Sequence, residues 1–373
     1  MRIFITLCLL GLVTLASGQK WNEFSVIYGQ HTSELPQPEA HVFRIFMDKN
    51  GFFYPSVQLP DALLKSKGSS ISNLLSSNDS LREQVAIQYK LDPKTATVPN
   101  IKESIIASIS KELEQKTKEY ESSFFMIHGF RKKAYGEKEN SLSSTDYLTL
   151  EREIQSTQKE KALFIEIYWD GTHISPIKAY KYRGFKLMER NALPQAKNAG
   201  YALRQLISNL NIDTLNIVSH SLGAVVANEL LFNTREQQTF PTPSQSVVNN
   251  IYIAPAIGFE AFLDFHDRNT EINFTEHDNY NLSVVYNPTD FVLLKSFHFK
   301  FINLDVEPTK YGNTSLGCDY NNDILKFNDL FKYKYPNTPK PRVLMVDDSI
   351  GWKAFCHLIR CYCSSPAFQN AFL

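Results

Sequence analysis

Residues 215–230 read LNIVSHSLGAVVANEL, and this stretch decides the fold. Its first four residues are typical of a buried strand, and the small apolar residues after the glycine predict a helix. Ser221 lies between the two, with Ser219 two places before it and Gly223 two places after it. A sharp strand-to-helix turn needs small residues at those two places, because the strand and the helix pass close together. We therefore predict that Ser221 lies on a tight turn at the end of a sheet strand.

A serine in that position favours nucleophilic chemistry. A hydroxyl is a poor nucleophile at neutral pH unless a base takes its proton, and such a turn exposes the oxygen beside a helix N-terminus. Ser219 stands where glycine is more usual, but serine is also small. The alternative is that Ser221 only caps a helix. The strand before it and the helix after it favour the nucleophile.

Working outward, short apolar runs alternate with longer periodic stretches along most of the chain. This pattern predicts an α/β protein with a mostly parallel central sheet, covered by helices on both faces. The predicted strands are 124–127, 162–169, 215–218, 247–254, 282–286 and 343–346, and the predicted helices are 101–120, 192–210 and 223–231.

No linker separates independent units, so one domain over 19–373 is expected. Its N-terminal part, 19–115, is predicted to hold a hairpin and helices. The hairpin has strands at 42–46 and 52–54, because Asn50 and Gly51 favour a turn. The catalytic core is expected over 116–373, with cap-like insertions around 255–280 and 305–340.

Composition and net charge are those of an ordinary globular protein. Hydrophobic residues make up 43% of the 373 residues and charged residues 21%, which is typical of a globular protein. The 39 basic residues balance the 39 acidic residues, so the overall charge gives no reason to expect nucleic acid as a partner.

The N-terminus has the pattern of an export signal. Arg2 precedes a mostly apolar run over 3–15, and the small residues Ala16, Ser17 and Gly18 follow. We predict that 1–18 is a cleavable signal peptide and that the mature chain is secreted or periplasmic. An uncleaved anchor is the alternative. The run is short for a membrane span, so no stable membrane insertion is expected.

Four cysteines follow the predicted signal peptide, and in an exported chain they permit disulfides. They are Cys318, Cys356, Cys361 and Cys363. The last three, with His357, also suggest a metal cluster, but their spacing matches no common zinc pattern. A bridge from Cys318 to one of the last three cysteines therefore fits the sequence, which does not choose among these partners, and no metal is expected.

An oxyanion hole needs two backbone N–H groups aimed at one point. One comes from the residue after the nucleophile, which is Leu222, and the other from the loop after an earlier strand. Phe130 is the candidate there, with Arg131 as its rival. His128 precedes the serine in chain order, so we expect it to brace this loop.

The catalytic acid is expected after a late strand. Asp290 follows the predicted strand 282–286 within a tight loop, where a carboxylate can orient an imidazole. An Asp that only caps the next turn is the alternative. Asp264 and Asp267 compete with it from an earlier position in the chain.

The catalytic base is expected after the last strand, 343–346. His357 follows that strand, which satisfies the chain order Ser, Asp, His. His298 competes, but it comes too early if 343–346 belongs to the sheet. His266 and His277 lie in the predicted cap.

Several of these segments together resemble a family of uncharacterised α/β-hydrolases that are related to serine esterases and lipases. The segments are His128-Gly129-Phe130, Ser219-His220-Ser221-Leu222-Gly223, Asn287-Pro288-Thr289-Asp290-Phe291-Val292-Leu293, and the tail with Val346-Asp347-Asp348, His357 and Ser365-Pro366-Ala367-Phe368. The resemblance covers roughly 42–373. It implies an α/β-hydrolase fold and a Ser-Asp-His hydrolase without a cofactor, and it leaves the substrate open.

The function expected from these residues is ester hydrolysis through an acyl-enzyme. Ser221 attacks the carbonyl, His357 transfers the proton and Asp290 orients His357. Export suggests a small-molecule, lipid or polysaccharide ester as substrate. A peptidase or thioesterase would use the same triad, and a non-catalytic binding protein on this fold is the alternative of a different class.

Overall fold

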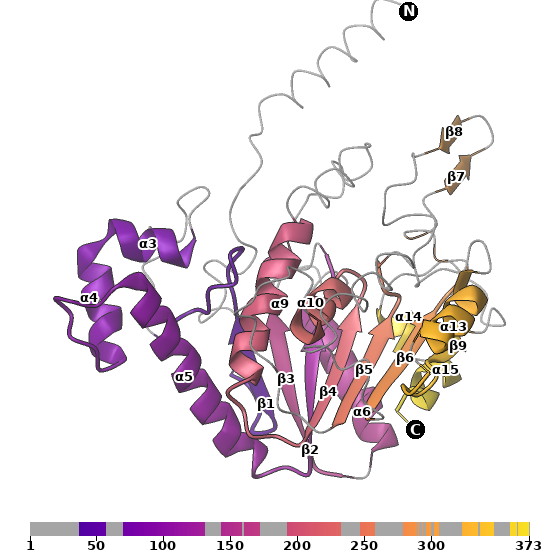
Figure 1. Ribbon diagram of the computed structural model, residues 1–373, viewed down its shortest axis with the longest axis horizontal. Helices are drawn as coiled ribbons and strands as arrows, with labels where there is room; N and C mark the ends of the chain where they lie inside the picture. Colours follow the sequence, from indigo (N-terminus) through magenta and orange to yellow (C-terminus); the bar gives the residue numbers. More distant parts are fainter. Residues whose placement is uncertain are drawn as a thin grey trace, which may run out of the picture.

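A seven-stranded sheet, all parallel, forms the centre of the protein in the computed structural model (Figure 1). Its strands follow the order β1-β3-β2-β4-β5-β6-β9. Their bounds are β1 Val42–Phe46, β2 Ser122–Ile127, β3 Ala162–Tyr168, β4 Thr214–His220, β5 Val247–Ile253, β6 Tyr280–Tyr286 and β9 Arg342–Met345. The structure describes residues 37–56, 70–130, 143–158, 160–171, 192–232, 247–257, 279–288, 290, 293, 296–299, 302–305, 323–334, 336–346, 359–363 and 365–372.

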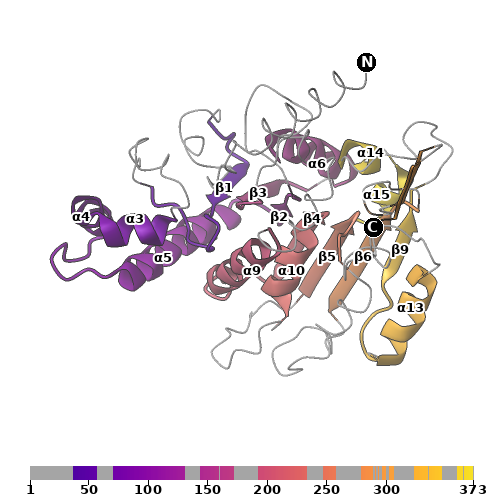
Figure 2. The ribbon, with the colours of Figure 1, turned by 90° about the horizontal axis from the view of Figure 1, so that it is seen from above.

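Helices lie on both faces of the sheet, as the view from above shows (Figure 2). One face carries α5 Val98–Thr117, α9 Leu193–Ile207 and α10 Gly223–Leu231, with α3 Ile71–Ser77 and α4 Asp79–Gln88 beyond α5. The opposite face carries α6 Ser143–Thr157, α14 Ile359–Cys363 and α15 Pro366–Asn370. A further helix, α13 Asp323–Lys334, lies next to β9. The α/β class with a parallel sheet is therefore confirmed.

All the predicted helices and strands occur except the strand at 52–54, and their ends shift by up to three residues. Helix α10 has the predicted bounds, and α5 begins three residues early because Thr97 caps it by accepting a hydrogen bond from the Asn100 N–H. The helix α6 was not predicted. Its buried positions include Asp146 and Glu151, which interrupt the apolar periodicity on which such a prediction depends.

The N-terminal hairpin differs from the prediction. Strand β1 pairs in parallel with β3 and so belongs to the main sheet, while the returning chain makes a single antiparallel bridge, between Met47 and Phe53. The Asp48 side chain fixes the turn after β1. Its carboxylate accepts hydrogen bonds from the backbone N–H groups of Phe52 and Ile71 at 2.9 and 2.7 Å. The backbone turns back at Gly51, where φ is 71°.

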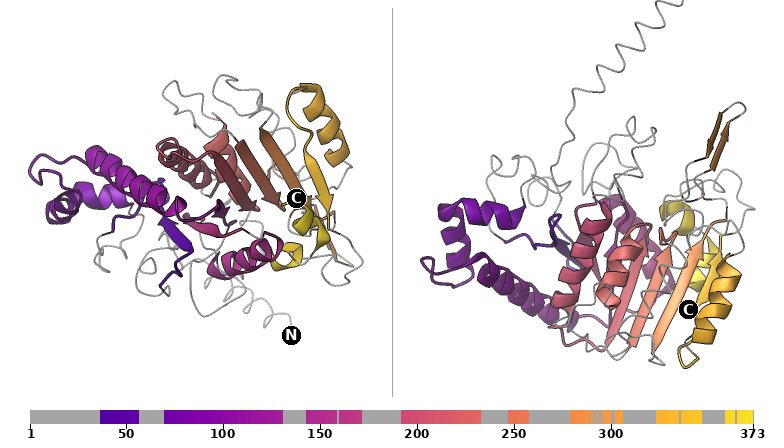
Figure 3. Two further views of the ribbon diagram at one scale, coloured as in Figure 1. Left: turned by 90° about the horizontal axis from the view of Figure 1, so that it is seen from below. Right: turned by 45° about the horizontal axis from the view of Figure 1, so that its top comes forward.

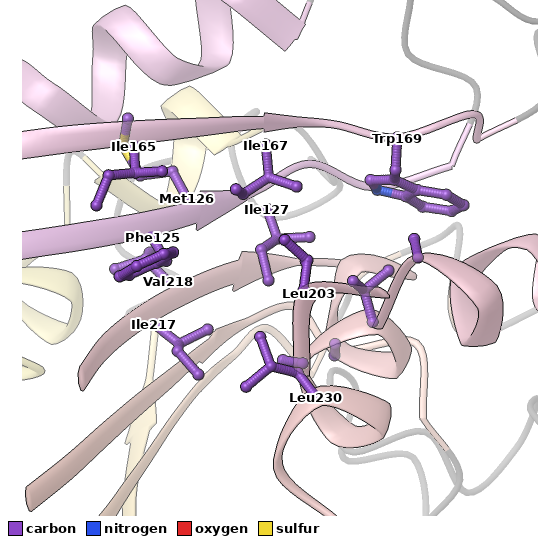
Figure 4. Close-up of a cluster of buried hydrophobic side chains, with 14 of the residues drawn as sticks. Phe125, Met126, Ile127, Ile165, Ile167, Trp169, Leu203, Ile217, Val218 and Leu230 are labelled. Carbon is purple, nitrogen blue, oxygen red and sulfur yellow. The ribbon is translucent and has the colours of Figure 1, made fainter. Parts of the chain in front are cut away.

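The core between β2, β3 and the helices α9 and α10 is apolar and close-packed (Figure 4). From the strands it contains Phe125, Ile127, Ile165 and Ile167, and from the helices Leu203 and Leu230. The two helices touch at Gly200, where a Cβ atom would lie 2.4 Å from the Val226 carbonyl oxygen. Nearby, the buried Arg204 donates to the Leu230 carbonyl at 2.9 Å.

The two cysteines that the structure describes differ in their bonding. Cys361 is disulfide-bonded, to a partner outside the described residues, and Cys363 is a buried free thiol. Among the described residues, no three His, Cys, Asp or Glu side chains gather in a way that would hold a metal ion.

Some sequence predictions fall outside the part of the chain that the structure describes. These are the signal peptide at 1–18, Cys318 and Cys356, and nearly all of the insertion at 255–280. Within 305–340, the described residues form α13. No described helix is both long and apolar enough to cross a lipid bilayer.

Candidate active site

The described candidate residues follow the carboxyl ends of three strands. Ser221 and Leu222 follow β4, Phe130 follows β2 and Asp290 follows β6. Parallel strands end at the same edge of their sheet, which is the upper edge in Figure 1. The topology therefore brings these residues to one edge of the molecule.

The remaining candidates fall into two groups. Outside the described residues lie His357, Arg131, Asp264, Asp267, His266 and His277. His298 belongs to β7 Ser296–Phe299, which pairs with β8 Ile302–Asp305 in a separate antiparallel sheet. Strand β9 pairs with β6 in the main sheet. Because residues 343–346 thus belong to the sheet, His298 lies too early in the chain for a base that is expected after the last strand.

Ser221 has a left-handed backbone conformation, with φ of 53°. For a residue with a Cβ atom this conformation costs about 1–2 kcal/mol, so the surroundings must hold it. Its N–H donates to the Ile253 carbonyl at 3.0 Å, and its carbonyl accepts from the N–H groups of Ala256 and Ala224 at 3.0 and 3.1 Å. The end of β5 and the start of α10 thus fix the serine from both sides.

Two glycines let the loop after β2 and the start of α10 approach Ser221. A Cβ atom at Gly129 would lie 2.8 Å from the Ser221 Cβ. At Gly223 it would lie 2.7 Å from the carbonyl oxygens of both Ile127 and His128. Neither position has room for a side chain, because backbone atoms cannot yield as a flexible side chain does. This contact explains why the sequence needs small residues in both loops.

The predicted oxyanion donors, Leu222 and Phe130, are the sequence neighbours of Ser221 and Gly129. Leu222 is the first residue after the serine, and among the described residues its N–H has no hydrogen-bond acceptor. Unpaired N–H groups are expected at the start of a helix, where they favour negative charge. Phe130 directly follows Gly129, where an added Cβ atom would lie 2.8 Å from the Ser221 Cβ.

His128 braces the loop after β2. Its Nδ1 lies 2.8 Å from the Gly129 carbonyl oxygen, which can only accept, so Nδ1 carries the proton. Its Nε2 then accepts from the Trp169 N–H at 3.3 Å. The Trp169 indole stacks on the imidazole at 5.5 Å and donates through Nε1 to the His128 carbonyl at 2.8 Å. With both ring nitrogens engaged, His128 is placed to hold the loop.

A buried cluster around the Glu166 carboxylate packs next to this loop. The Glu166 carboxylate accepts from Arg44 Nε at 2.6 Å and from the Tyr168 hydroxyl at 2.9 Å. Burial, together with the charge of Glu166, raises the pKa of Glu151 to about 8. Glu151 therefore keeps its proton to a higher pH than a solvent-exposed carboxyl group does. Tyr147, packed edge-on against Tyr168, links this group to the site, since it accepts from the His128 N–H at 3.1 Å.

Asp290 is fully buried, and hydrogen bonds hold both its side chain and its backbone. Its Oδ2 accepts from the Tyr362 hydroxyl at 2.7 Å, and its Oδ1 accepts from the Leu293 N–H at 3.2 Å. Its own N–H donates to the Asn287 carbonyl at 3.0 Å, which closes a tight turn after β6. Tyr362 belongs to α14, so the segment that follows His357 in sequence is anchored on Asp290.

Sequence reasoning missed three residues of this site. Trp169 directly follows β3, so the rule that collects residues at the carboxyl ends of strands could have found it. Tyr362 gave no signal, because its contact with Asp290 spans 72 residues. Ala254 also has a positive φ, of 46°, although alanine has no preference for that conformation.

The arrangement combines, at one sheet edge, a strained serine, a buried carboxylate and an N–H group for which the described residues provide no acceptor. These are components that acyl transfer uses, and they need no cofactor. A comparison with protein-family models gives no match to this sequence. None of the curated proteins matches it significantly, so the α/β-hydrolase family stays a prediction.

Proposed function

We propose that the protein is a serine hydrolase with an α/β-hydrolase fold, which cleaves carboxylic esters outside the cytoplasm. The observation that carries this proposal is the backbone of Ser221. A non-glycine residue with φ of 53°, fixed between the centre of a parallel sheet and a helix N-terminus, costs stability. Such strain is typical of a nucleophile whose oxygen must stand clear of the strand end.

In the proposed reaction, Ser221 Oγ bonds to the ester carbonyl carbon while His357 takes the hydroxyl proton. The N–H groups of Leu222 and Phe130 stabilise the negative oxygen of the tetrahedral intermediate. The intermediate collapses, the bond to the alcohol breaks, and His357 returns the proton to that alcohol. Water then repeats the sequence on the acyl-enzyme and releases the acid.

Asp290 supports this sequence by orienting His357. It is buried and fixed by Tyr362 and Leu293, as an orienting carboxylate must be to keep its geometry. His357 precedes α14 by two residues, and α14 provides Tyr362. Tyr362, five residues after His357 in sequence, therefore ties the chain that follows the proposed base to the proposed acid.

A fluorophosphonate probe tests the proposal, because it reacts with activated serines. We expect the purified protein to be labelled at Ser221, as peptide mapping would show, and Ser221→Ala and His357→Ala to lose the label. Ser219→Ala is a matched control: its buried hydroxyl has no hydrogen-bond partner among the described residues, and labelling should persist. A folded protein that takes no label would exclude the hydrolase and favour a binding protein on this fold.

Turnover assays with different acyl substrates separate the substrate classes. We expect turnover of simple esters, with amide and thioester substrates of the same acyl group cleaved more slowly. Faster cleavage of a peptide would assign the triad to a peptidase instead.

A further inference from the structure

A second, polar cleft opens at the opposite edge of the sheet, where the strands begin. It has a volume of about 760 Å³ and is lined by residues at the amino ends of β2, β4, β5, β6 and β9. The residues that directly follow α6 and α15 also line the cleft. These two helices lie on one face of the sheet, which Figure 3 (left) shows from below. The volume falls within the range of about 300–1,000 Å³ that is usual for small-molecule sites.

The floor of the cleft is a ladder of three asparagines in register. Asn216, Asn249 and Asn281 are direct neighbours on β4, β5 and β6. Asn281 Nδ2 donates to Asn249 Oδ1 at 2.9 Å, and Asn249 Nδ2 donates to Asn216 Oδ1 at 2.7 Å. Asn216 Nδ2 in turn donates to the Ser123 carbonyl at 3.0 Å. These bonds fix all three amides and point their donors in one direction.

This ladder is unusual at such a position. Parallel strands are normally apolar on both faces, because helices cover them. Asparagine is also depleted in strands, and three in register lie where apolar residues would pack. Since the three amides also line the cleft, they form a polar surface that a ligand can contact.

Each amide retains capacity for a ligand. An asparagine side chain has two N–H donors and an oxygen with two lone pairs. The ladder uses one donor of each residue, so at least one N–H and one lone pair remain on every amide. The three amides repeat at the strand spacing of about 4.8 Å. Such an array suits a ligand with repeated groups that both donate and accept hydrogen bonds.

The charges around the cleft favour a neutral ligand. Lys118 and Arg342 line it together with Glu121, Glu160 and Asp213, so neither sign dominates. Both cations are already engaged. Lys118 pairs with Glu114 at 3.1 Å, and Arg342 donates to the carbonyls of Asn370 and Ala371 at 3.1 and 2.8 Å.

The cleft also provides some apolar surface. Phe372 lines it, only partly buried, and its ring is fixed edge-on against Phe124 and Phe368 at 6.1 and 4.9 Å. A ligand with hydroxyl groups on its edges and C–H groups on its faces would use both the amides and this ring.

We propose that the cleft binds a neutral saccharide, with the asparagine ladder as its recognition surface. Sugar hydroxyls donate and accept at once, as the free amide positions require, and they carry no charge. The site is separate from Ser221. Asn216 lies near the start of β4 and Ser221 directly follows its end. The two residues are five positions apart, which is about 16 Å along a strand. Binding here therefore does not depend on the proposed hydrolase activity.

The test uses the full mature chain carrying Ser221→Ala, so that no ligand is cleaved. Binding to an array of neutral and acidic glycans is followed by titration calorimetry on the glycans that bind. We expect at least one neutral oligosaccharide to bind, and Asn281→Ala to weaken it by about tenfold or more. Asn281 terminates the ladder and is only half-buried, so this variant should keep the wild-type melting temperature. Asn249→Leu, at the ladder's centre, should abolish binding.

A matched control is Asn209→Ala, which removes an exposed asparagine at the end of α9 that forms a hydrogen bond only within its own turn. Its affinity should equal that of the parent. The proposal is overturned if no neutral glycan binds, if only acidic glycans bind, or if folded Asn281→Ala binds as tightly as the control. Fluorophosphonate labelling in the Ser221-containing variants is read separately, so failure of either proposal leaves the other interpretable.

Discussion

Gly223→Ala is the perturbation that tests most directly how the strand end and the helix are joined. The added Cβ atom would lie 2.7 Å from two backbone oxygens, those of Ile127 and His128, whereas ordinary contact begins at 3.4 Å. Neither oxygen is on a flexible side chain. The start of α10 and the end of β2 must therefore separate by roughly 0.7 Å.

This separation has two measurable costs. Overpacking of this kind destabilises a fold by about 1–3 kcal/mol, which urea unfolding would show. The movement also shifts Leu222 relative to Phe130, the two proposed oxyanion donors. Misplacement of reacting groups by about 1 Å can cost 10²-fold in rate. We therefore expect the rate of fluorophosphonate labelling at Ser221 to fall about 10- to 100-fold.

Gly200→Ala provides the control, because it creates a similar clash away from the sheet edge. Its Cβ atom would lie 2.4 Å from the Val226 carbonyl and 2.5 Å from the Glu229 Cβ, between α9 and α10. This variant should lose at least as much stability but label close to the wild-type rate while it is folded. Equal labelling rates in the two folded variants would refute the argument that spacing at Gly223 sets the reactivity of Ser221.

Three further predictions follow from single contacts. Ser221→Gly should be more stable than Ser221→Ala by about 1 kcal/mol, because glycine adopts a positive φ without strain; equal melting temperatures would contradict this. The pKa of Glu151 rises from 4.5 to about 8 on folding, through burial and the charge of Glu166, so the native state holds a proton that the unfolded chain releases. Wild-type stability should consequently fall as pH rises from about 4.5 to 8, and Glu151→Gln should flatten that fall in melting temperature; an unchanged slope would assign the dependence to other groups. Tyr362→Phe removes a hydrogen bond to the buried Asp290 and should lower the free energy of unfolding by about 1.5–3 kcal/mol, with slower labelling of Ser221; an unchanged urea midpoint would show that the bond contributes nothing.

Local patterns predicted the centre of the sheet well. The stretch from β4 to α10 has a short apolar run, small residues at fixed places and a small-residue helix, and each constraint acts within a few residues. The structure matches that prediction closely. The same is true of β2, β3 and β5, whose apolar runs reflect burial on both faces.

Features that depend on distant contacts could not be predicted. Strand β1 pairs with β3, more than a hundred residues later, although its sequence reads equally well as part of a hairpin. The short helices α14 and α15 are fixed by packing on α6 and β9, and so is Tyr362, the partner of Asp290. Such contacts leave no periodicity in the sequence, because each residue meets its partner only after the sheet has formed.

The two proposals follow from one property of a parallel sheet, whose two edges offer different chemistry. At the carboxyl edge, loops leave the strands toward helix N-termini, and there Ser221 meets an N–H group suited to negative charge. At the amino edge, the residues at the start of each strand remain in register, so three asparagines form a repeated surface. Strand β4 spans the two edges with seven residues, or about 23 Å. A small ester is too short to reach both sites, whereas an esterified polysaccharide is not. If both sites act together, saccharide binding would raise the effective concentration of such a polymer near Ser221 without changing the chemistry there.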